Sequence, residues 1–314
     1  MKLSFQKIKE LTVGAVEIRE EKDAIRFYKC TVPQVKIWRE MREDFGIRAE
    51  ETSGIRLDFH TNAEEVIFTV RGKRFEVKIN SVLYRQFANE SGDFFAVKLS
   101  LPAGEKRVTL FFPSFCSGML RSVEISDTAW VLPHQFDRKF LFIGDSITQG
   151  CQANFDCLSF ANRVSDYFNA ESVICGIGGA YFDKRNFEKT DFNPKTIFVA
   201  YGCNDFDHYE TVEEMYQNAI ELLELIRNAY PDEKIFILSP TWRTDAELPH
   251  GMGVFSDCRK VISKASKTLR LPLIDAYDFI PHMTEFFNDI VHPNDLGFSF
   301  YAEKLIFELS KSGI

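Results

Sequence analysis

The chain has 314 residues, with 46 acidic and 38 basic side chains, so its formal net charge is −8. Hydrophobic residues make up 45% and charged residues 27%, which excludes an intrinsically disordered chain and is typical of a globular protein with one or two domains. The acidic balance, without any cluster of Lys and Arg, predicts that nucleic acid is not a partner.

The beginning of the chain does not have the pattern of a secretion signal. Lys7, Lys9 and Glu10 interrupt the apolar stretch that a signal peptide needs, and no apolar run approaches the length of a membrane span. We therefore expect a cytoplasmic protein without a membrane partner. An odd number of cysteines without zinc-ligand spacing favours reduced thiols and predicts no metal site. The seven are Cys30, Cys116, Cys151, Cys157, Cys175, Cys203 and Cys258.

The first part of the chain has the pattern of β-strands that are buried on one face. Short runs rich in Val, Ile and Phe alternate with charged residues, and turn signals such as Arg71-Gly72 separate the runs. Long amphipathic helices are not expected here. We predict an all-β, jelly-roll-like sandwich over residues 1–133, with a linker at residues 131–137. The clearest strand candidates are residues 55–59, 75–79 and 108–112.

After this linker, continuous apolar runs alternate with helical patterns. The runs are apolar on both faces, as in strands of a parallel sheet that helices cover. The clearest helix is predicted from Val212 to Tyr230, with Thr211 and Glu214 placed as a capping box. We therefore predict a doubly wound α/β domain over residues 134–314. The strand candidates are residues 140–143, 172–175, 196–200, 235–238 and 273–274, and further helices are expected over residues 160–168, after 256 and after 294.

Four motifs stand where a site is expected in such a domain. In a parallel sheet, ligands bind beyond the carboxyl ends of the strands, so the residues that follow each strand are candidates. Three motifs follow the first three strands, and the fourth precedes the last helix. In chain order they are Gly144-Asp145-Ser146-Ile147-Thr148-Gln149-Gly150, Gly176-Ile177-Gly178-Gly179, Tyr201-Gly202-Cys203-Asn204-Asp205 and Asn288-Asp289-Ile290-Val291-His292-Pro293-Asn294.

These motifs contain the groups that ester hydrolysis requires. The hydroxyl of Ser146 is a weak nucleophile until a base takes its proton, and His292 is suited to that role near neutral pH. Asp289 is a candidate partner for the other ring nitrogen. The oxyanion that forms during the reaction needs fixed donors. The candidates are the backbone N–H groups of Ser146 and Gly179 and the side-chain amide of Asn204.

Each motif alone also fits an ordinary structural role. Ser146 alone would more often cap a helix, and Asn204 and His292 would be loop residues. The glycine run lacks the third glycine of a dinucleotide site, where Tyr181 stands instead, so no nucleotide cofactor is expected. The conjunction of four motifs, in order and each at a strand end or helix entry, favours the catalytic interpretation.

The order of these motifs resembles the four blocks of the SGNH, or GDSL-like, hydrolase superfamily over residues 138–314. The resemblance implies a flavodoxin-like domain and an enzyme without cofactor or metal. It implies Ser146 as nucleophile, His292 as base and Asp289 as the residue that orients the base. Ser146, Gly179 and Asn204 would form the oxyanion hole. Ile147 stands in place of the leucine in the family name. Cys175 precedes the glycine block, which leaves the choice between Gly178 and Gly179 open.

The predicted β-domain extends the resemblance to carbohydrate esterase family 2, whose members remove acetyl groups from sugar hydroxyls. By this analogy Trp242 stacks on a sugar ring and Arg243 binds its hydroxyls, while a place in the helix–sheet core fits Trp242 equally well. Further candidates for substrate binding or for lining the pocket are Asp145, Gly178, Asp207 and His208. Three phenylalanines follow the motifs and are expected to wall a small pocket: Phe155, Phe182 and Phe206.

We predict a serine esterase that hydrolyses short acyl esters, foremost O-acetyl groups on carbohydrates, through an acyl-enzyme on Ser146. A GDSL-type lipase, thioesterase or lysophospholipase is the alternative in the same class, although no lid or interfacial amphipathic helix is apparent. A catalytically silent carbohydrate-binding protein is the alternative from another class, and retention of the four motifs argues against it. The expected partner is a small-molecule or oligosaccharide acyl ester, and a homo-oligomer is left open.

Overall fold

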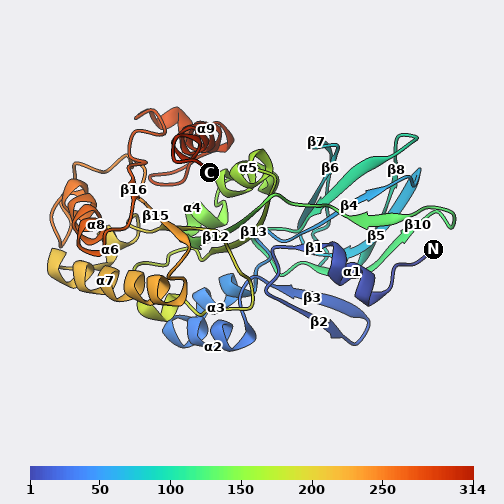
Figure 1. The fold of residues 1–314 in the computed structure, drawn as a ribbon, viewed down its shortest axis with the longest axis horizontal. Helices are drawn as coiled ribbons and strands as arrows, with labels where there is room; N and C mark the ends of the chain where they lie inside the picture. Colours follow the sequence, from blue (N-terminus) through green and yellow to red (C-terminus); the bar gives the residue numbers. More distant parts are fainter.

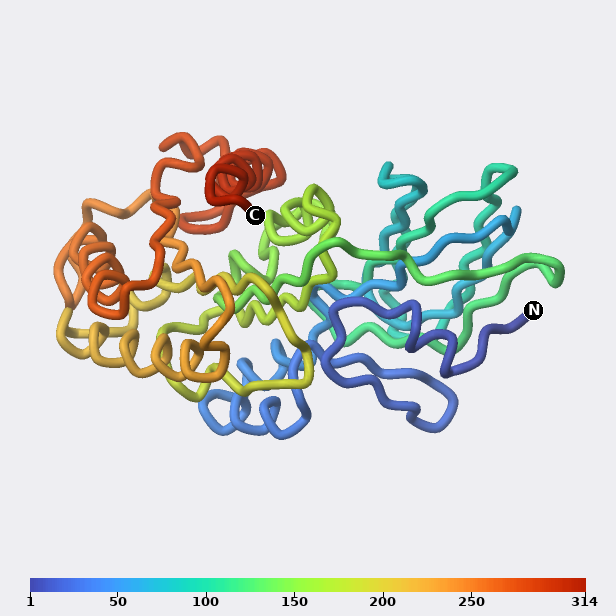
Figure 2. The backbone as a smooth tube through the Cα atoms, viewed as in Figure 1, coloured from blue at the N-terminus to red at the C-terminus, as the bar shows by residue number.

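The computed structural model describes residues 1–314. Strands of the first part of the chain gather at one end of the molecule, and a helix-covered sheet forms the other end (Figure 1). The tube in Figure 2 shows one exception to this order, because a segment near residues 30–50 lies beside the C-terminal part. That segment proves important for the candidate site.

Two antiparallel sheets form the N-terminal sandwich, in the strand orders β2-β3-β10-β5-β8 and β1-β4-β9-β6-β7, with β11 also paired to β4. In β5, Val66, Phe68 and Val70 are buried and the residues between them are partly exposed, as a period of two requires. The predicted sandwich is therefore confirmed, while its jelly-roll type stays a prediction. The strands are β1 (Thr12–Val13), β2 (Glu17–Glu21), β3 (Ala24–Tyr28), β4 (Arg56–Thr61), β5 (Glu65–Arg71), β6 (Arg74–Ile79), β7 (Val82–Ala88), β8 (Phe95–Ser100), β9 (Lys106–Phe111), β10 (Met119–Ile125) and β11 (Val131–Pro133).

The prediction that this part is all-β was wrong, because it contains α1 (Phe5–Leu11), α2 (Val32–Met41) and α3 (Glu43–Glu50). The helix signals of α2 are local: the Thr31 side chain accepts a hydrogen bond from the Gln34 N–H, and a proline follows the cap. Both α2 and α3 are short and rich in charged residues, so their apolar face is narrow. Their buried side chains belong to the hydrophobic cluster of the C-terminal part: Val35, Trp38, Phe45 and Ala49.

The C-terminal part has a parallel sheet in the order β13-β12-β14-β15-β16. Numbered from the first strand of this sheet, the order is 2-1-3-4-5, which is the doubly wound, flavodoxin-like arrangement. The strands are buried on both faces, and each lies where its apolar run predicted it. They are β12 (Arg138–Gly144), β13 (Ala170–Gly176), β14 (Thr196–Ala200), β15 (Lys234–Leu238) and β16 (Leu273–Ile274).

Helices cover this sheet from both sides. Figure 1 shows α5 and α9 above the strands and α7 below them. Half of the capping box predicted for α7 is present: Thr211 Oγ1 accepts a hydrogen bond from the Glu214 N–H at 3.2 Å, while the Glu214 side chain makes no return bond to the Thr211 N–H. The α-helices are α4 (Ser146–Gln149), α5 (Phe160–Tyr167), α6 (Asp205–His208), α7 (Val212–Ala229), α8 (Phe255–Leu269) and α9 (Asp295–Lys311), with short 3₁₀ helices at Asp156–Leu158, Lys184–Asn186 and Thr284–Phe286.

The segment predicted as a linker, residues 131–137, is partly a strand. Its first three residues form β11, which pairs with β4 from Phe59 to Thr61. Next to this strand, His134 contacts His60 on one side and Asn169 on the other, at 2.9 and 2.7 Å. The connection is therefore held to both halves of the molecule. We propose the division into residues 1–133 and 134–314 along the chain, with α2 and α3 packed across it.

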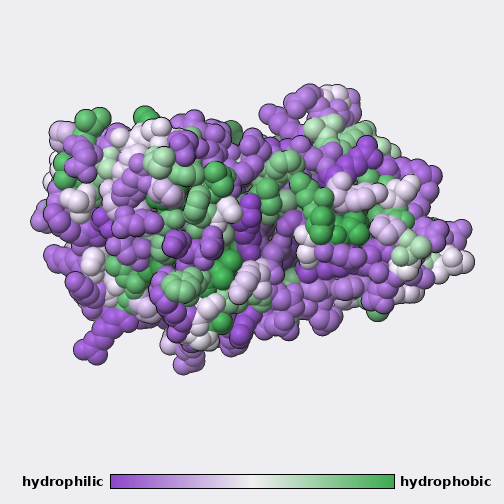
Figure 3. All heavy atoms as spheres, turned by 90° about the horizontal axis from the view of Figure 1, so that it is seen from above, coloured by the Kyte–Doolittle hydropathy of each residue, from purple (hydrophilic) through white to green (hydrophobic).

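Phenylalanines supply much of both hydrophobic cores. The rings of Phe142 and Phe198 stack at 4.6 Å in the parallel sheet, and those of Phe75 and Phe112 meet edge to face at 5.5 Å in the sandwich. Hydrophilic side chains cover most of the face in Figure 3, with hydrophobic patches over both halves. No helix has the length and apolar character needed to cross a membrane. All seven cysteines are free.

Candidate functional site

Ser146 lies at the first position of α4, directly after the end of β12. A helix leaves the N–H at this position without an intrahelical acceptor, so the Ser146 N–H is available to a ligand. Gly144, the last residue of β12, has no room for a side chain, since a Cβ there would collide with Thr148 Oγ1 in α4 and lie 2.6 Å from the carbonyl oxygen of Ala200 in β14. The close approach of α4 and of the neighbouring strand explains the glycine two residues before the serine.

His292 approaches this serine from the loop before α9. Its Nε2 lies 2.7 Å from Ser146 Oγ, and its Nδ1 lies 2.7 Å from Asp289 Oδ2. The other carboxylate oxygen of Asp289 accepts hydrogen bonds from the N–H groups of Val291 and His292 at 2.9 and 2.8 Å. Although partial burial acts to raise it, these hydrogen bonds hold the pKa of Asp289 below its ordinary value. The carboxylate is therefore ionised at neutral pH beside the imidazole.

Two further donors face the serine from neighbouring loops. Gly179 has φ +80°, a conformation that glycine adopts freely, and its N–H has no acceptor in the protein. The side-chain Nδ2 of Asn204 donates to the carbonyl oxygen of Ala180 at 3.0 Å, which fixes the orientation of the amide. The second hydrogen of that amide remains free. The structure thus brings Gly179 and Asn204 to the same cavity as Ser146 and His292.

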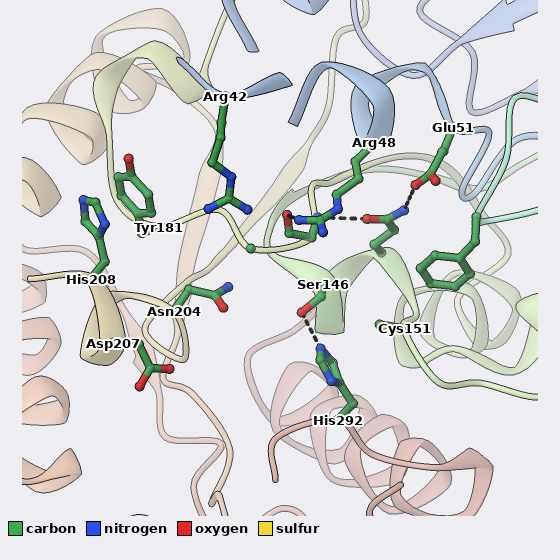
Figure 4. A pocket seen from close by; sticks show the side chains of 14 residues that line it. Arg42, Arg48, Glu51, Ser146, Cys151, Tyr181, Asn204, Asp207, His208 and His292 are labelled. Carbon is green, nitrogen blue, oxygen red and sulfur yellow. Dashed lines mark hydrogen bonds between the residues drawn. The ribbon is translucent and has the colours of Figure 1, made fainter. Parts of the chain in front are cut away.

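These groups open into one cavity of about 510 Å³. Figure 4 shows the Ser146–His292 hydrogen bond on one side of it and Asn204, Tyr181 and His208 on the other. Most of the lining is polar or charged. The lining residues are Arg42, Arg48, Glu51, Phe115, Ser146, Gln149, Cys151, Gly178, Gly179, Tyr181, Asn204, Asp207, His208 and His292.

One wall of this cavity comes from the N-terminal part and was not predicted. Arg42 is the N-cap residue of α3, Arg48 lies within this helix, and Glu51 directly follows it. Gln149 joins this wall to the motifs: its amide donates to Glu51 at 2.5 Å, and its oxygen accepts the N–H of Gly178 at 2.9 Å. Residues 39–51 are visibly rich in charge, but no local sequence pattern indicates that they lie near Ser146, about a hundred residues later.

The matching family model covers residues 142–299 and is described as the GDSL-like lipase/acylhydrolase family. The match spans half of the chain. The chain belongs to this family. Membership supports esterase activity, and the predicted resemblance to the GDSL-like hydrolases is thereby confirmed.

Solved structures of similar fold cover nearly the whole chain of this GDSL-like hydrolase. A salicylyl-acyltransferase, SsfX3, from a tetracycline biosynthetic pathway has a TM-score of 0.85 at 16% identity, covering 96% of this chain and 94% of its own. A putative GDSL-like lipase from Bacteroides ovatus has a TM-score of 0.78 at 19% identity, covering 97% of this chain and 96% of its own. A family two carbohydrate esterase from Clostridium thermocellum, in complex with cellohexaose, has a TM-score of 0.69 at 17% identity, covering 83% of this chain and 93% of its own. The comparison with curated proteins found no match.

The structure places the predicted substrate-binding residues of this hydrolase in two groups. Gly178 and Asp207 line the cavity. Asp145 does not, because its carboxylate is buried and caps α4 through the Ile147 N–H at 2.9 Å. The predictions for Trp242 and Arg243 are likewise corrected, since neither lines the cavity.

Both residues are held by neighbours outside the cavity. The Trp242 ring stacks on His282 at 5.1 Å, so the interpretation as part of the core wall fits it better. Arg243 is 96% buried by side chain and forms ion pairs with Asp207 at 2.8 Å and with Asp245 at 2.5 Å. Its ion pair with Asp207 holds the short helix α6, which carries Asp207.

The aromatic wall also differs from the prediction. Phe182 and Phe206 are fully buried in the core, and Phe155 does not line the cavity. Apolar side chains of this type are more stable in the core than at a polar cavity. The aromatic residues at the cavity are Phe115 and Tyr181, and the Tyr181 ring stacks on that of His208, which does line it. No group of three or more His, Cys, Asp or Glu side chains is arranged to hold a metal ion.

Proposed function

We propose that this chain is a serine esterase that removes short acyl groups, foremost O-acetyl groups, from carbohydrates. The observation that carries the proposal is the hydrogen-bonded chain Ser146–His292–Asp289, which opens into a polar cavity. A base at 2.7 Å from a hydroxyl, itself oriented by a carboxylate, is the arrangement that activates serine as a nucleophile.

In the first half of the reaction, Ser146 Oγ attacks the ester carbonyl and its proton passes to His292 Nε2. The carbonyl oxygen becomes an oxyanion, which accepts hydrogen bonds from the N–H groups of Ser146 and Gly179 and from the Asn204 amide. Each such donor typically stabilises the transition state by about 3 kcal/mol. When the intermediate collapses, the bond to the alcohol oxygen breaks and His292 gives its proton to that oxygen.

In the second half, water replaces the alcohol. His292 Nε2 takes a proton from the water, whose oxygen attacks the acyl carbonyl, and the same donors hold the second oxyanion. Collapse releases the carboxylic acid and returns the proton to Ser146 Oγ. Asp289 stays ionised throughout and stabilises the imidazolium form of His292, which exists only between proton transfers.

The cavity supports a short acyl group rather than a long chain. Its volume of about 510 Å³ is within the range of small-ligand pockets. The lining offers no continuous apolar channel, since its hydrophobic members are Phe115, Cys151 and Tyr181. A carbohydrate as the alcohol part is supported by the shared fold with carbohydrate esterases, one of them named as an acetyl xylan esterase.

The test compares esters and variants of the full chain. We expect hydrolysis of 4-nitrophenyl acetate well above that of the octanoate, and release of acetate from acetylated xylo- or manno-oligosaccharides. Ser146→Ala and His292→Ala should abolish both activities, while Ser310→Ala, on the exposed side of α9, should retain them. Full activity in Ser146→Ala refutes the mechanism. A preference for octanoate favours the lipase alternative, and glycan binding without hydrolysis favours the silent binding protein.

A further inference from the structure

Two arginine side chains converge above the glycine motif of the cavity. A Cβ built on Gly179 would lie 2.8 Å from Arg48 Nη1 and 2.9 Å from Arg42 Nη2. Figure 4 shows both guanidinium groups reaching from the N-terminal wall toward Ser146 and Asn204. Their positive charges therefore lie next to the place where the proposed mechanism puts the ester carbonyl.

The protein compensates only part of this charge. Arg42 donates two hydrogen bonds to the Asp44 carboxylate, at 2.5 and 2.7 Å, and Arg48 Nη1 lies 3.2 Å from the same carboxylate. One carboxylate shared by two guanidinium groups leaves a net charge of about one positive unit. This part of the cavity is thus cationic although the whole protein has a net charge of −8.

The acidic residues of the lining do not cancel the remaining charge, because other groups hold them. Asp207 is paired with Arg243 at 2.8 Å and lies 2.9 Å from a ring nitrogen of His250. Glu51 accepts a hydrogen bond from Gln149. Burial raises the pKa of Glu51, and the positive charge that acts on it most strongly is that of Lys29 rather than Arg48.

Both arginines also keep unused donors. A guanidinium group carries five N–H bonds. Arg48 donates from Nη1 to the Gly178 carbonyl, while its Nε and Nη2 make no hydrogen bond to the protein. Arg42 uses Nε and Nη2 for Asp44 and leaves Nη1 free. The side chains of Arg42 and Arg48 are 51% and 35% exposed, so a ligand in the cavity can reach these donors.

We propose that Arg42 and Arg48 form a subsite for an anionic group on the substrate, a carboxylate or a phosphate, close to the acyl ester. Guanidinium groups bind both anions with paired hydrogen bonds. Because the arginines are adjacent to Gly179, the anion and the ester must belong to neighbouring positions of one small unit, such as a single sugar ring. The substrate class is therefore an acylated uronic acid or sugar phosphate. This inference rests on the proposed esterase function.

The test uses substrates that differ in one group. Methyl glucoside and methyl glucuronoside, acetylated on the same ring hydroxyl, differ only in a neutral CH₂OH against a carboxylate, and methyl glucoside 6-phosphate with the same acetyl group supplies the phosphate arm. We measure acetate release and report the ratio of kcat/KM for each anionic substrate over the neutral one. We expect a ratio of about ten or more for one of the anions, lowered by added salt. The anionic substrate with the higher ratio shows whether the subsite binds a carboxylate or a phosphate.

Variants assign the preference to the two arginines. Arg42→Gln and Arg48→Gln should each lower the ratio toward one, mainly by raising KM for the anionic substrate. The matched control is Arg39→Gln, which removes the same charge from α2, where Arg39 pairs with Glu43 and Glu50 outside the cavity. This variant should keep the ratio of the wild type. Equal losses on neutral and anionic esters in Arg42→Gln and Arg48→Gln would overturn the subsite.

Failure of the subsite and failure of the esterase give different results. Hydrolysis of the neutral sugar ester and of 4-nitrophenyl acetate with a ratio near one overturns the subsite and leaves the esterase standing. If no ester is hydrolysed, calorimetric titration of Ser146→Ala with unacetylated methyl glucuronoside and methyl glucoside decides. Binding of the glucuronoside alone, lost on adding Arg48→Gln, supports the subsite without the esterase. Equal binding or none overturns it.

Discussion

Replacing Asp289 by asparagine keeps the shape of the side chain and reverses one hydrogen bond. Oδ1 of Asp289 accepts the N–H groups of Val291 and His292 at 2.9 and 2.8 Å, and Oδ2 lies 2.7 Å from His292 Nδ1. Only an oxygen accepts the two backbone donors, so the amide must point its NH₂ group at Nδ1. The ring proton then moves to Nε2, which no longer accepts the proton of Ser146.

The size of the effect follows from this change of tautomer. In serine proteases, the same exchange of aspartate for asparagine lowers kcat by about 10⁴. That factor is about 5 kcal/mol of transition-state stabilisation. We expect Asp289→Asn to lose activity by this factor and to remain above the uncatalysed rate, because the oxyanion donors are intact. Folding should change little, since Asn Oδ1 keeps both backbone hydrogen bonds.

The assay is the kcat for 4-nitrophenyl acetate, with thermal melting followed by circular dichroism. Asp289→Ala is the matched comparison: it removes the acceptor for the Val291 and His292 N–H groups as well, so Tm should fall together with activity. Asp289→Asn with activity within tenfold of the wild type would refute the tautomer argument. A fall in Tm as large as that of Asp289→Ala would refute the assigned amide orientation.

Three further predictions concern single groups of the site. Gly179→Ala should lower kcat/KM for 4-nitrophenyl acetate about 100-fold, because φ at this residue is +80° and the new Cβ meets Arg48 Nη1. Gly178 has no positive φ, so Gly178→Ala should lower kcat/KM by less, and equal losses in the two variants contradict this argument. Burial, with some help from a nearby carboxylate, raises the pKa of Asp205 to about 7, so the folded state keeps a proton that the unfolded state has released. The free energy of unfolding in urea should therefore fall by about 2 kcal/mol from pH 5.5 to 8 through this group. Burial also raises the pKa of Asp145 to about 7, so Asp205→Asn should remove its own share of the slope and leave that of Asp145, and an unchanged slope contradicts the assignment. Burial also raises the pKa of Cys151 to about 11, so the thiol is protonated at neutral pH and iodoacetamide should leave the esterase activity intact. Rapid inactivation that Cys151→Ser prevents would contradict a protonated thiol.

The parallel sheet was predictable because its signals are local. Each strand buried on both faces is a continuous apolar run, and the residues at its carboxyl end are small or polar. The short helices α2 and α3 were not predicted. Their buried residues face the other half of the molecule, so only long-range packing reveals which of their positions are apolar contacts.

The site shows the same division. Ser146, Asn204 and His292 stand in motifs whose order along the chain already predicted that they meet, and the structure brings them to one cavity. The substrate-binding predictions failed for Trp242 and Arg243, because sequence proximity to a strand end does not say which way a side chain points. Arg243 turns into buried ion pairs instead.

The sequence by itself determined the class of the protein: four motifs at strand ends, in family order, whose chemistry depends on the residues within each short segment. Only the tertiary structure decided what surrounds the serine. Arg42 and Arg48 reach it because two contacts hold α3 against the glycine loop. Lys29 Nζ donates to the Gly176 carbonyl at 2.9 Å, and the Phe45 ring packs beside that of Tyr181. Such contacts join residues far apart in the chain, and their stability comes from burial and packing of both partners, which no local pattern records.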